Sequence, residues 1–155
     1  MAKTSLGKKF ETKLREDWNN LEDSLIIRIN DNFNGYKNIS GISDFIAYHY
    51  PNIFFIECKE HKGNTFPLAN LTQYDKLMSV QGIKGVRSGV VLWFSEKDTV
   101  VYVPVKTFKK LKEDGKKSLN INDINNYELI VVPSVKKRTF LDSDYSVLFN
   151  MEEGW

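Results

Sequence analysis

The stretch FFIECKEHKG (Phe54–Gly63) decides how the rest of the chain can fold, because an apolar run leads directly into charged residues. Such a run is typical of a buried strand, and Glu57 and Lys59 lie at its end. Residues two apart in a strand point to the same face, so these two side chains are neighbours, whereas Cys58 points to the opposite face. A carboxylate and an ammonium group therefore stand side by side at the edge of the predicted core.

The residues just before this stretch predict the strand that pairs with it. ISDFIAYHY (Ile42–Tyr50) contains β-branched and aromatic residues, and the Pro51-Asn52 break that follows it suits a tight turn. We therefore expect a hairpin of two antiparallel strands. In that hairpin Asp44 lies on the first strand, close to Glu57 on the second.

Helical spacing on both sides of the hairpin predicts two helices. Apolar residues at steps of three and four favour an amphipathic helix from about Thr4 to Asp23, and the β-branched segment Ser24–Asp31 predicts a strand after it. Apolar residues recur at helical spacing over Leu71–Met78, before two glycines end the pattern. The hairpin is therefore expected between an opening helix with its strand and a second helix.

The last third of the chain predicts a second hairpin, a short helix and a final strand. Two apolar runs are joined by the polar turn Ser95–Asp98. KTFKKLKEDG (Lys106–Gly115) is typical of a basic helix that ends at a glycine. YELIVVPSV (Tyr127–Val135) is typical of a strand, and Pro133 places it at a sheet edge or a strand end because proline cannot donate a ladder hydrogen bond.

The order and number of these elements predict one domain. The chain has 155 residues, of which 41% are hydrophobic, so it can bury one sizeable core and is too short to argue for two. Hairpins that alternate with helices predict an α/β fold, in which helices flank a central mixed sheet. We therefore treat residues 1–155 as a single domain.

The content of cysteine and histidine argues against a zinc site. Cys58 has no second cysteine with which to form an internal disulfide, and the two histidines do not have a usual zinc-ligand spacing. No apolar stretch approaches the ~20 residues needed to cross a bilayer, and no N-terminal segment resembles a signal peptide. We expect a soluble protein of a reducing compartment, the cytoplasm.

A net charge of +2 gives no overall signature for nucleic-acid binding, so that argument depends on where the charges lie. Each basic cluster taken alone is typical of a solvated surface, whereas three together favour a polyanionic partner. The clusters are Lys3, Lys8, Lys9, Lys13 and Arg15; Lys106, Lys109, Lys110, Lys112, Lys116 and Lys117; and Lys136, Lys137 and Arg138.

The predicted closeness of Asp44 and Glu57 indicates a chemistry. Two carboxylates that converge at a strand end repel each other, and a divalent cation that binds hard oxygen ligands relieves the repulsion. An ammonium group beside them, that of Lys59, can orient a water or hold a phosphate oxygen. This combination suits phosphodiester hydrolysis. The alternative is a surface cross-strand ion pair, worth ~0.2–1 kcal/mol.

The context of these residues resembles a known family. SDFIAYHYPNIFFIECKEHKGNTFPL, which runs into the loop Thr65–Leu68, is similar to the PD-(D/E)xK nuclease superfamily and, within it, to RecU-type Holliday junction resolvases of Gram-positive bacteria and their phages. GKKSLNIND (Gly115–Asp123) is similar to a later region of that family. The resemblance covers about Gly41 to Asp123 and implies a restriction-endonuclease-like αβββαβ core.

The resemblance also implies roles for individual residues. Asp44 and Glu57 would bind the metal, together with the backbone carbonyl of Cys58, and Lys59 would act on the attacking water or the scissile phosphate. Two further residues match supporting positions of the family and are catalytic candidates. They are Gln73, at the start of the second helix, and Glu11, in the opening helix.

Several basic residues are candidates for DNA contact. His61 follows Lys59 by two positions, on the same face if the strand continues, although an ordinary loop histidine is the alternative. The other candidates are Lys62, Lys37, Lys8 and Lys9.

Together these features predict a magnesium-dependent endodeoxyribonuclease, with Mn²⁺ as a possible substitute, that acts on Holliday junctions or other branched DNA. A homodimer would match the two-fold symmetry of a junction, and a phage origin would place it in the bacterial host cytoplasm or nucleoid. The short connection Ser24–Ser43 lacks the stalk insertion of RecU-type enzymes. The alternatives are therefore a related nuclease for linear or flapped DNA, and a non-catalytic DNA-binding or phage–host interaction protein.

Overall fold

We describe the protein from a computed structural model, which places residues 5–29, 41–138, 140–152 and 155. The α-helices in these residues are α1 (Leu6–Asn19), α2 (Tyr74–Val80) and α3 (Val105–Glu113). The strands are β1 (Ser24–Arg28), β2 (Phe45–His49), β3 (Asn52–His61), β4 (Thr65–Pro67), β5 (Val86–Phe94), β6 (Thr99–Pro104), β7 (Ser118–Asn120), β8 (Ile130–Val132), β9 (Ser134–Lys136) and β10 (Leu141–Ser143). The 3₁₀-helices are η1 (Leu68–Asn70), η2 (Ser95–Lys97), η3 (Ile121–Asn125) and η4 (Tyr145–Asn150). None of the described helices combines the length and the apolar character that a membrane crossing requires.

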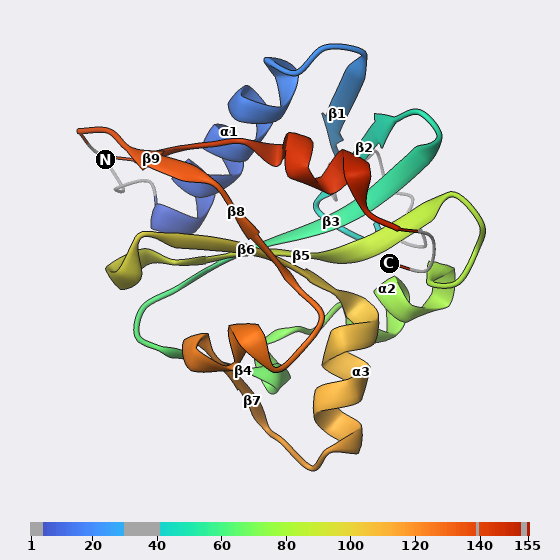
Figure 1. Cartoon of the computed structure of the whole chain (residues 1–155), viewed down its shortest axis with the longest axis vertical. Coiled ribbons are helices and arrows are strands. Elements are labelled where there is room, and N and C mark those ends of the chain that lie inside the picture. The colour runs from blue at the N-terminus through green and yellow to red at the C-terminus, as the bar shows by residue number, and fades with distance from the viewer. Residues whose placement is uncertain (1–4, 30–40, 139, 153–154) are drawn as a thin grey trace, which may run out of the picture.

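A six-stranded mixed sheet forms the centre of the molecule, in the order β1-β2-β3-β5-β6-β8 (Figure 1). β3 and β5 run parallel, and the other neighbouring strands run antiparallel. Side chains of α1 and η4 pack on one face, and those of α2 and α3 pack on the other. The predicted α/β fold, with a central mixed sheet flanked by helices, is confirmed.

Helix α1 is shorter than the predicted segment 4–23. Ser5 caps its N-terminus, since the Ser5 hydroxyl accepts a hydrogen bond from the backbone N–H of Lys8 at 3.2 Å. The helix ends at Asn19, and the chain then turns through Asp23, whose φ of 51° is left-handed. The predicted apolar stripe is buried against the sheet and includes Phe10, Leu14 and Trp18.

Polar contacts join α1 to the β9–β10 hairpin. Lys13 Nζ lies 2.6 Å from Asp17 Oδ1 and 2.6 Å from Asp142 Oδ1. The backbone N–H of Ser143 donates to Asp17 Oδ2 at 3.0 Å. Residues from the two ends of the sequence therefore meet on the same face of the sheet.

The predicted hairpin around Pro51 is confirmed as β2 and β3. The register pairs Phe45 with Ile56 and His49 with Asn52. Asp44 differs from its prediction, because it directly precedes β2 rather than lying within the strand. The backbone carbonyl of Asp44 nevertheless accepts from Ile29 N at 2.8 Å, which keeps Asp44 beside the sheet.

The second predicted hairpin and the basic helix are also confirmed. β5 and β6 are joined by η2, after which Asp98 adopts a left-handed φ of 48°. Helix α3 ends at Glu113, and Gly115 with a φ of 77° follows it, as expected for a glycine after a helix C-terminus.

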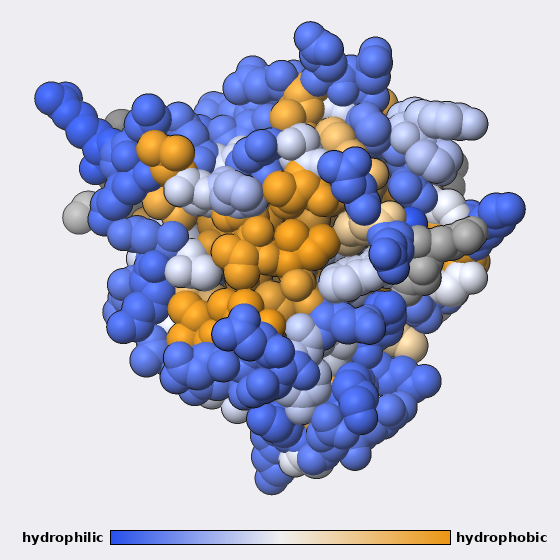
Figure 2. All heavy atoms as spheres, viewed as in Figure 1, coloured by the Kyte–Doolittle hydropathy of each residue, from blue (hydrophilic) through white to orange (hydrophobic). Residues whose placement is uncertain are grey.

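The predicted strand 127–135 is divided, because Pro133 separates β8 from β9. β8 forms one edge of the six-stranded sheet, while β9 pairs with β10. Val131 of β8 is 49% exposed, and Figure 2 shows apolar side chains gathered at the centre of the face over which β8 runs. The short pair β4–β7 was not predicted, since three-residue strands are too short to show an alternating pattern.

Candidate active site

The predicted carboxylate pair is assembled where β2 begins beside β3. Phe45 pairs with Ile56, so Asp44 comes opposite Glu57. The backbone N–H of Asp44 donates to Glu57 Oε2 at 3.2 Å, and the backbone N–H of Cys58 donates to Asp44 Oδ2 at 3.0 Å. Each carboxylate is therefore fixed by the backbone of the strand segment opposite.

Glu57 is buried, with only 3% of its surface exposed. Burial raises the pKa of Glu57 to about 8, and the negative charge of Asp44 acts in the same direction, whereas the charge of Lys59 acts against it. Without a bound cation, Glu57 therefore tends to hold its proton at neutral pH.

Lys59 lies on the same face as Glu57, as its position two residues later predicted. Its Nζ is 3.6 Å from Glu57 Oε1, and its side chain is 27% exposed. The ammonium group thus stands between a buried carboxylate and solvent. A phosphate that approaches the Glu57 side of the sheet can meet it.

The donor set fits a hard divalent cation. The Glu57 carboxylate is buried and that of Asp44 half-buried. Two carboxylates held close together bind hard cations well, because the cation removes their repulsion. The N–H and C=O of one strand residue point to the same side, so the Cys58 carbonyl faces the side on which Asp44 lies. Among the described residues, no group of three or more His, Cys, Asp or Glu side chains could hold a metal. A backbone carbonyl, as predicted for Cys58, would enlarge the donor set.

The Cys58 thiol belongs to the opposite face of the sheet. It is buried in the core beneath α1. Burial raises the pKa of this thiol well above its ordinary value, and the charges of Glu11, Asp44 and Glu57 add to the effect. Cys58 therefore has neither the exposure nor the thiolate character of a reactive cysteine.

Glu11 lies on α1, and its carboxylate is bound by Arg28 of β1. Arg28 Nη2 and Nε donate to Glu11 Oε2 at 2.8 and 3.1 Å. Arg28 pairs with Phe45 in the register, one residue after Asp44, so Glu11 is held at the same end of the sheet as the carboxylate pair. The sequence had not singled out Arg28, and an arginine at a strand end carries no pattern that would have revealed this contact. The catalytic role of Glu11 stays a prediction.

Gln73 is the N-cap residue of α2, as its sequence position predicted. Its side-chain oxygen accepts a hydrogen bond from the Thr72 hydroxyl at 2.8 Å, and its backbone carbonyl accepts from Leu77 N. Within the described part of the chain, its side chain makes no hydrogen bond to Asp44, Glu57 or Lys59. Its supporting role also stays a prediction.

The predicted DNA-contact residues fall in different surroundings. His61 packs edge-on against Phe66, with ring centroids 5.7 Å apart, so the imidazole belongs to the Lys59 face but is half-buried. The exposed candidates are Lys62, directly after β3, and Lys8 and Lys9, on α1. The remaining candidate, Lys37, lies outside the described residues.

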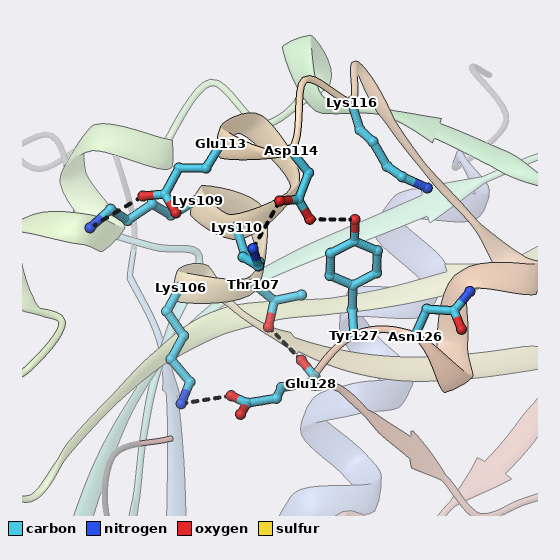
Figure 3. A pocket seen from close by; sticks show the side chains of 10 residues that line it. All are labelled: Lys106, Thr107, Lys109, Lys110, Glu113, Asp114, Lys116, Asn126, Tyr127 and Glu128. Carbon is cyan, nitrogen blue, oxygen red and sulfur yellow. Dashed lines mark hydrogen bonds and ion pairs between the residues drawn. The ribbon is translucent and has the colours of Figure 1, made fainter.

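The second predicted basic cluster is largely neutralised. A pocket of about 700 Å³ lies beside α3, and neither Asp44 nor Glu57 lines it. Figure 3 shows the side chains that line this pocket. Its lysines turn toward acidic partners rather than forming a bare cationic surface. The pairs are Lys106 with Glu128, Lys109 with Glu113, and Lys110 with Asp114.

Comparisons with known proteins agree with this geometry. The family model of recombination protein U matches residues 25–142, which include β2, β3 and the carboxylate pair. No curated protein matches the chain. The structure is similar to that of Archaeoglobus fulgidus Hjc, described as a Holliday junction resolvase from an archaeal hyperthermophile, with a TM-score of 0.58 and 19% sequence identity over 78% of this chain and 93% of that chain.

The likeness to Hjc shows a shared fold, and the family match covers well over half of the chain. The resemblance inferred from the Asp, Glu-x-Lys and TFPL segments is thereby confirmed. The chain belongs to the recombination protein U family.

Proposed function

We propose that this protein is an endodeoxyribonuclease that cuts four-way DNA junctions. The observation that carries the proposal is the Asp44–Glu57 pair, in which Glu57 is buried and Asp44 half-buried, held by reciprocal backbone hydrogen bonds, with Lys59 Nζ 3.6 Å from Glu57. Family membership supports the class of reaction, and the fold shared with the Holliday junction resolvase Hjc supports the class of substrate.

Asp44, Glu57 and the Cys58 carbonyl would hold Mg²⁺, or Mn²⁺ in its place. Such a cation supplies a bound water of lowered pKa and offsets negative charge on the phosphate. The protein holds both carboxylates in place through backbone N–H groups before any cation arrives. Little reorganisation is then required on binding, which favours a tight and well-defined site.

Lys59 is suited to act on the scissile phosphate. Its ammonium group is partly exposed and is attached to the same strand as Glu57, so it can donate hydrogen bonds to a phosphate oxygen while the strand fixes its position. Donors aimed at charge that develops in the transition state contribute more to rate than to ground-state binding. Glu57, in turn, keeps the Lys59 side chain turned toward the site.

The exposed lysines supply the DNA contacts in this proposal. Lys62 follows the active-site strand directly, while Lys8 and Lys9 lie on α1. Such contacts neutralise backbone phosphates without reading sequence. Since a junction has two opposed strands to cut, a two-fold symmetric homodimer would present two active sites together.

The proposal is tested by incubating the protein with a labelled four-way junction, a flap and a linear duplex of equal length, with and without magnesium. Symmetric cleavage of the junction that requires the cation is expected. Cation-dependent cleavage of flap or duplex in preference to the junction would establish the related-nuclease alternative. Binding without cleavage in either Mg²⁺ or Mn²⁺ would establish the non-catalytic one.

A further inference from the structure

Arg87 is a buried arginine without a charge partner among the described residues. It lies in β5, is 6% exposed, and its Nε is buried with no hydrogen-bond partner. The ion pairs of the described chain do not include it. Burying an unpaired cation is costly. A buried guanidinium that no described side chain neutralises therefore points to an anion that the protein binds.

Arg87 does not belong to the candidate active site. Arg87 and Val91 are four positions apart in β5, so their side chains point to the same face of the sheet. Val91 lies in the core beneath α1, so the Arg87 side chain lies on the face opposite Lys59. It pairs with Phe54 in the register. From Phe54 to Lys59 is five positions along β3, or roughly 16 Å at about 3.3 Å per residue.

A second unpaired polar group lies near Arg87. The Tyr102 hydroxyl is buried without a hydrogen-bond partner, and burial raises the pKa of Tyr102 while the charge of Arg87 acts to lower it. The Tyr102 ring lies over Gly89, where an added Cβ would come within 2.7 Å of its Cζ and Oη. The guanidinium and the hydroxyl both offer donors. Within the described part of the chain, neither Arg87 Nε nor the Tyr102 hydroxyl has an acceptor.

A pocket with cationic side chains adjoins Arg87. It has a volume of about 210 Å³ and is lined by the segment Gln81–Arg87 and by Trp155. Lys84 is exposed in this segment, and none of the described residues that line the pocket is acidic. A water molecule needs only about 10–15 Å³ of such space, so the pocket admits an anion of several atoms.

We propose that this pocket, the Arg87 pocket, binds a phosphate group. A guanidinium matches two phosphate oxygens with parallel hydrogen bonds, and a lysine adds a point charge at the rim. The group would come either from a free phosphate or nucleotide, or from a DNA backbone. The site goes beyond the proposed nuclease activity, because it shares no residue with the carboxylate pair.

Inorganic phosphate is the first probe. A ligand that binds only the folded state raises the melting temperature, so phosphate at about ten times its Kd should raise Tm by roughly 3–6 °C relative to chloride at equal ionic strength. The measurement is a thermal scan over phosphate concentration. A wild-type Tm that does not respond up to ~50 mM phosphate, beyond what chloride produces, would overturn a phosphate site of useful affinity.

Three variants assign the response to the pocket. Arg87→Met should abolish it, and should fold at least as stably as the wild type in chloride because it removes an unpaired buried charge. Lys84→Gln should weaken it, whereas Lys97→Gln, which changes an exposed lysine at the other end of β5, should leave it unchanged. If Arg87→Met fails to fold, Arg87→Lys and Lys84→Gln carry the test. A full response in both Lys84→Gln and an Arg87 variant would refute the assignment.

Binding to duplex DNA in calcium then identifies the source of the phosphate. If the pocket takes a backbone phosphate, phosphate competes with DNA, and Arg87→Met weakens DNA binding and lowers the salt slope by about 1. If the pocket takes a free phosphate or nucleotide, the DNA affinity of Arg87→Met equals that of the wild type while its phosphate response is lost. Either result supports the pocket, and an inactive but phosphate-responsive protein would separate it from the proposed nuclease.

Discussion

The Glu57 carboxyl group lies in a place that disfavours its charged form, and this fixes how the free protein should respond to pH. Its pKa is raised from 4.5 to about 8, so between these values the folded state binds more protons than the unfolded state. The free energy of unfolding should therefore fall as pH rises through about 4.5 to 8, when metal is removed with EDTA. Urea unfolding at several pH values measures the slope.

Two variants isolate Glu57 in this measurement. Glu57→Gln should flatten the pH dependence, because an amide does not titrate. Glu96→Gln, which changes an exposed glutamate of η2, should keep the wild-type slope. Equal slopes for Glu57→Gln and the wild type would show that burial of Glu57 does not control the pH response.

Removing either carboxylate should remove cleavage while DNA binding survives. Asp44→Asn and Glu57→Gln keep the size of each side chain but remove the charge that would hold the cation, so we expect at least a ~10³-fold loss of rate in magnesium. The exposed lysines are unchanged, so affinity for DNA in calcium should stay near that of the wild type. Calorimetry of Mn²⁺ binding provides a readout separate from cleavage. Normal turnover in either variant would exclude that residue from the site.

Lys59 and Lys62 should separate rate from affinity. Lys59→Ala should lower the single-turnover rate on saturating DNA by ~10²–10³-fold with little change in Kd, because its donor is aimed at charge that develops in the transition state. Lys62→Ala, three residues further on, should weaken binding but cut at the normal rate once saturated. A Lys59→Ala protein that binds weakly and cuts normally would make Lys59 a simple phosphate contact.

At the scale of residues, the sequence could predict the part of the site whose residues lie in one strand or across one short hairpin. Glu57 and Lys59 are two apart in one strand, and a short hairpin fixes Asp44 opposite them, so strand geometry alone brings the three together. The Glu11–Arg28 contact joins two separate elements, and its geometry depends on how α1 packs. Arg87 gave no signal, since an isolated arginine in a strand has no periodicity that marks it as unpaired.

Among the elements, the β5–β6 pair depends on the absence of a side chain at Gly89. A Cβ there would come within 2.7 Å of the Val103 carbonyl oxygen as well as of the Tyr102 ring, and the backbone oxygen cannot move without disturbing β6. Gly89→Ala should therefore cost about 1–3 kcal/mol and lower Tm by several degrees. Differential scanning calorimetry measures it.

Gly7→Ala is the matched control for this substitution. Gly7 lies in the first turn of α1, where a Cβ meets only the Ser5 hydroxyl at 3.9 Å, and alanine is a better helix former than glycine. We expect no loss, and a gain of up to about 1 kcal/mol. A Gly89→Ala protein as stable as the Gly7→Ala protein would contradict the close packing of Tyr102 over Gly89.

Elements with a strong local pattern were predicted, and those that depend on tertiary contact were not. The stripe of α1, the β2–β3 hairpin and the β5–β6 hairpin each carry a period or a turn that the sequence displays. The strands β4, β7 and β10 have three residues each and exist because a partner lies beside them. The order of strands in the sheet likewise depends on long-range packing.

For the molecule as a whole, the proposal predicts a preference for junction DNA that outlasts its affinity for duplex. Phosphate contacts lose most of their contribution between ~50 and ~200 mM salt, whereas recognition of a branched shape adds geometry that salt does not remove. Affinities for junction and duplex of equal length, measured in calcium over this range, should diverge. Equal affinities throughout, or a monomer by sedimentation on junction DNA, would leave a metal-dependent nuclease without junction selectivity.

The contact of Asp17 with Lys13 and Ser143 has a consequence for folding during synthesis. Asp17 accepts a hydrogen bond from the backbone N–H of Ser143, and Ser143 is synthesised 126 residues after Asp17. At about 5–20 residues per second, α1 waits roughly 6–25 s for that partner. During this interval the face of α1 that carries Trp18 lacks the cover of Tyr145 and Phe149, so it stays open to chaperones until that segment has been synthesised.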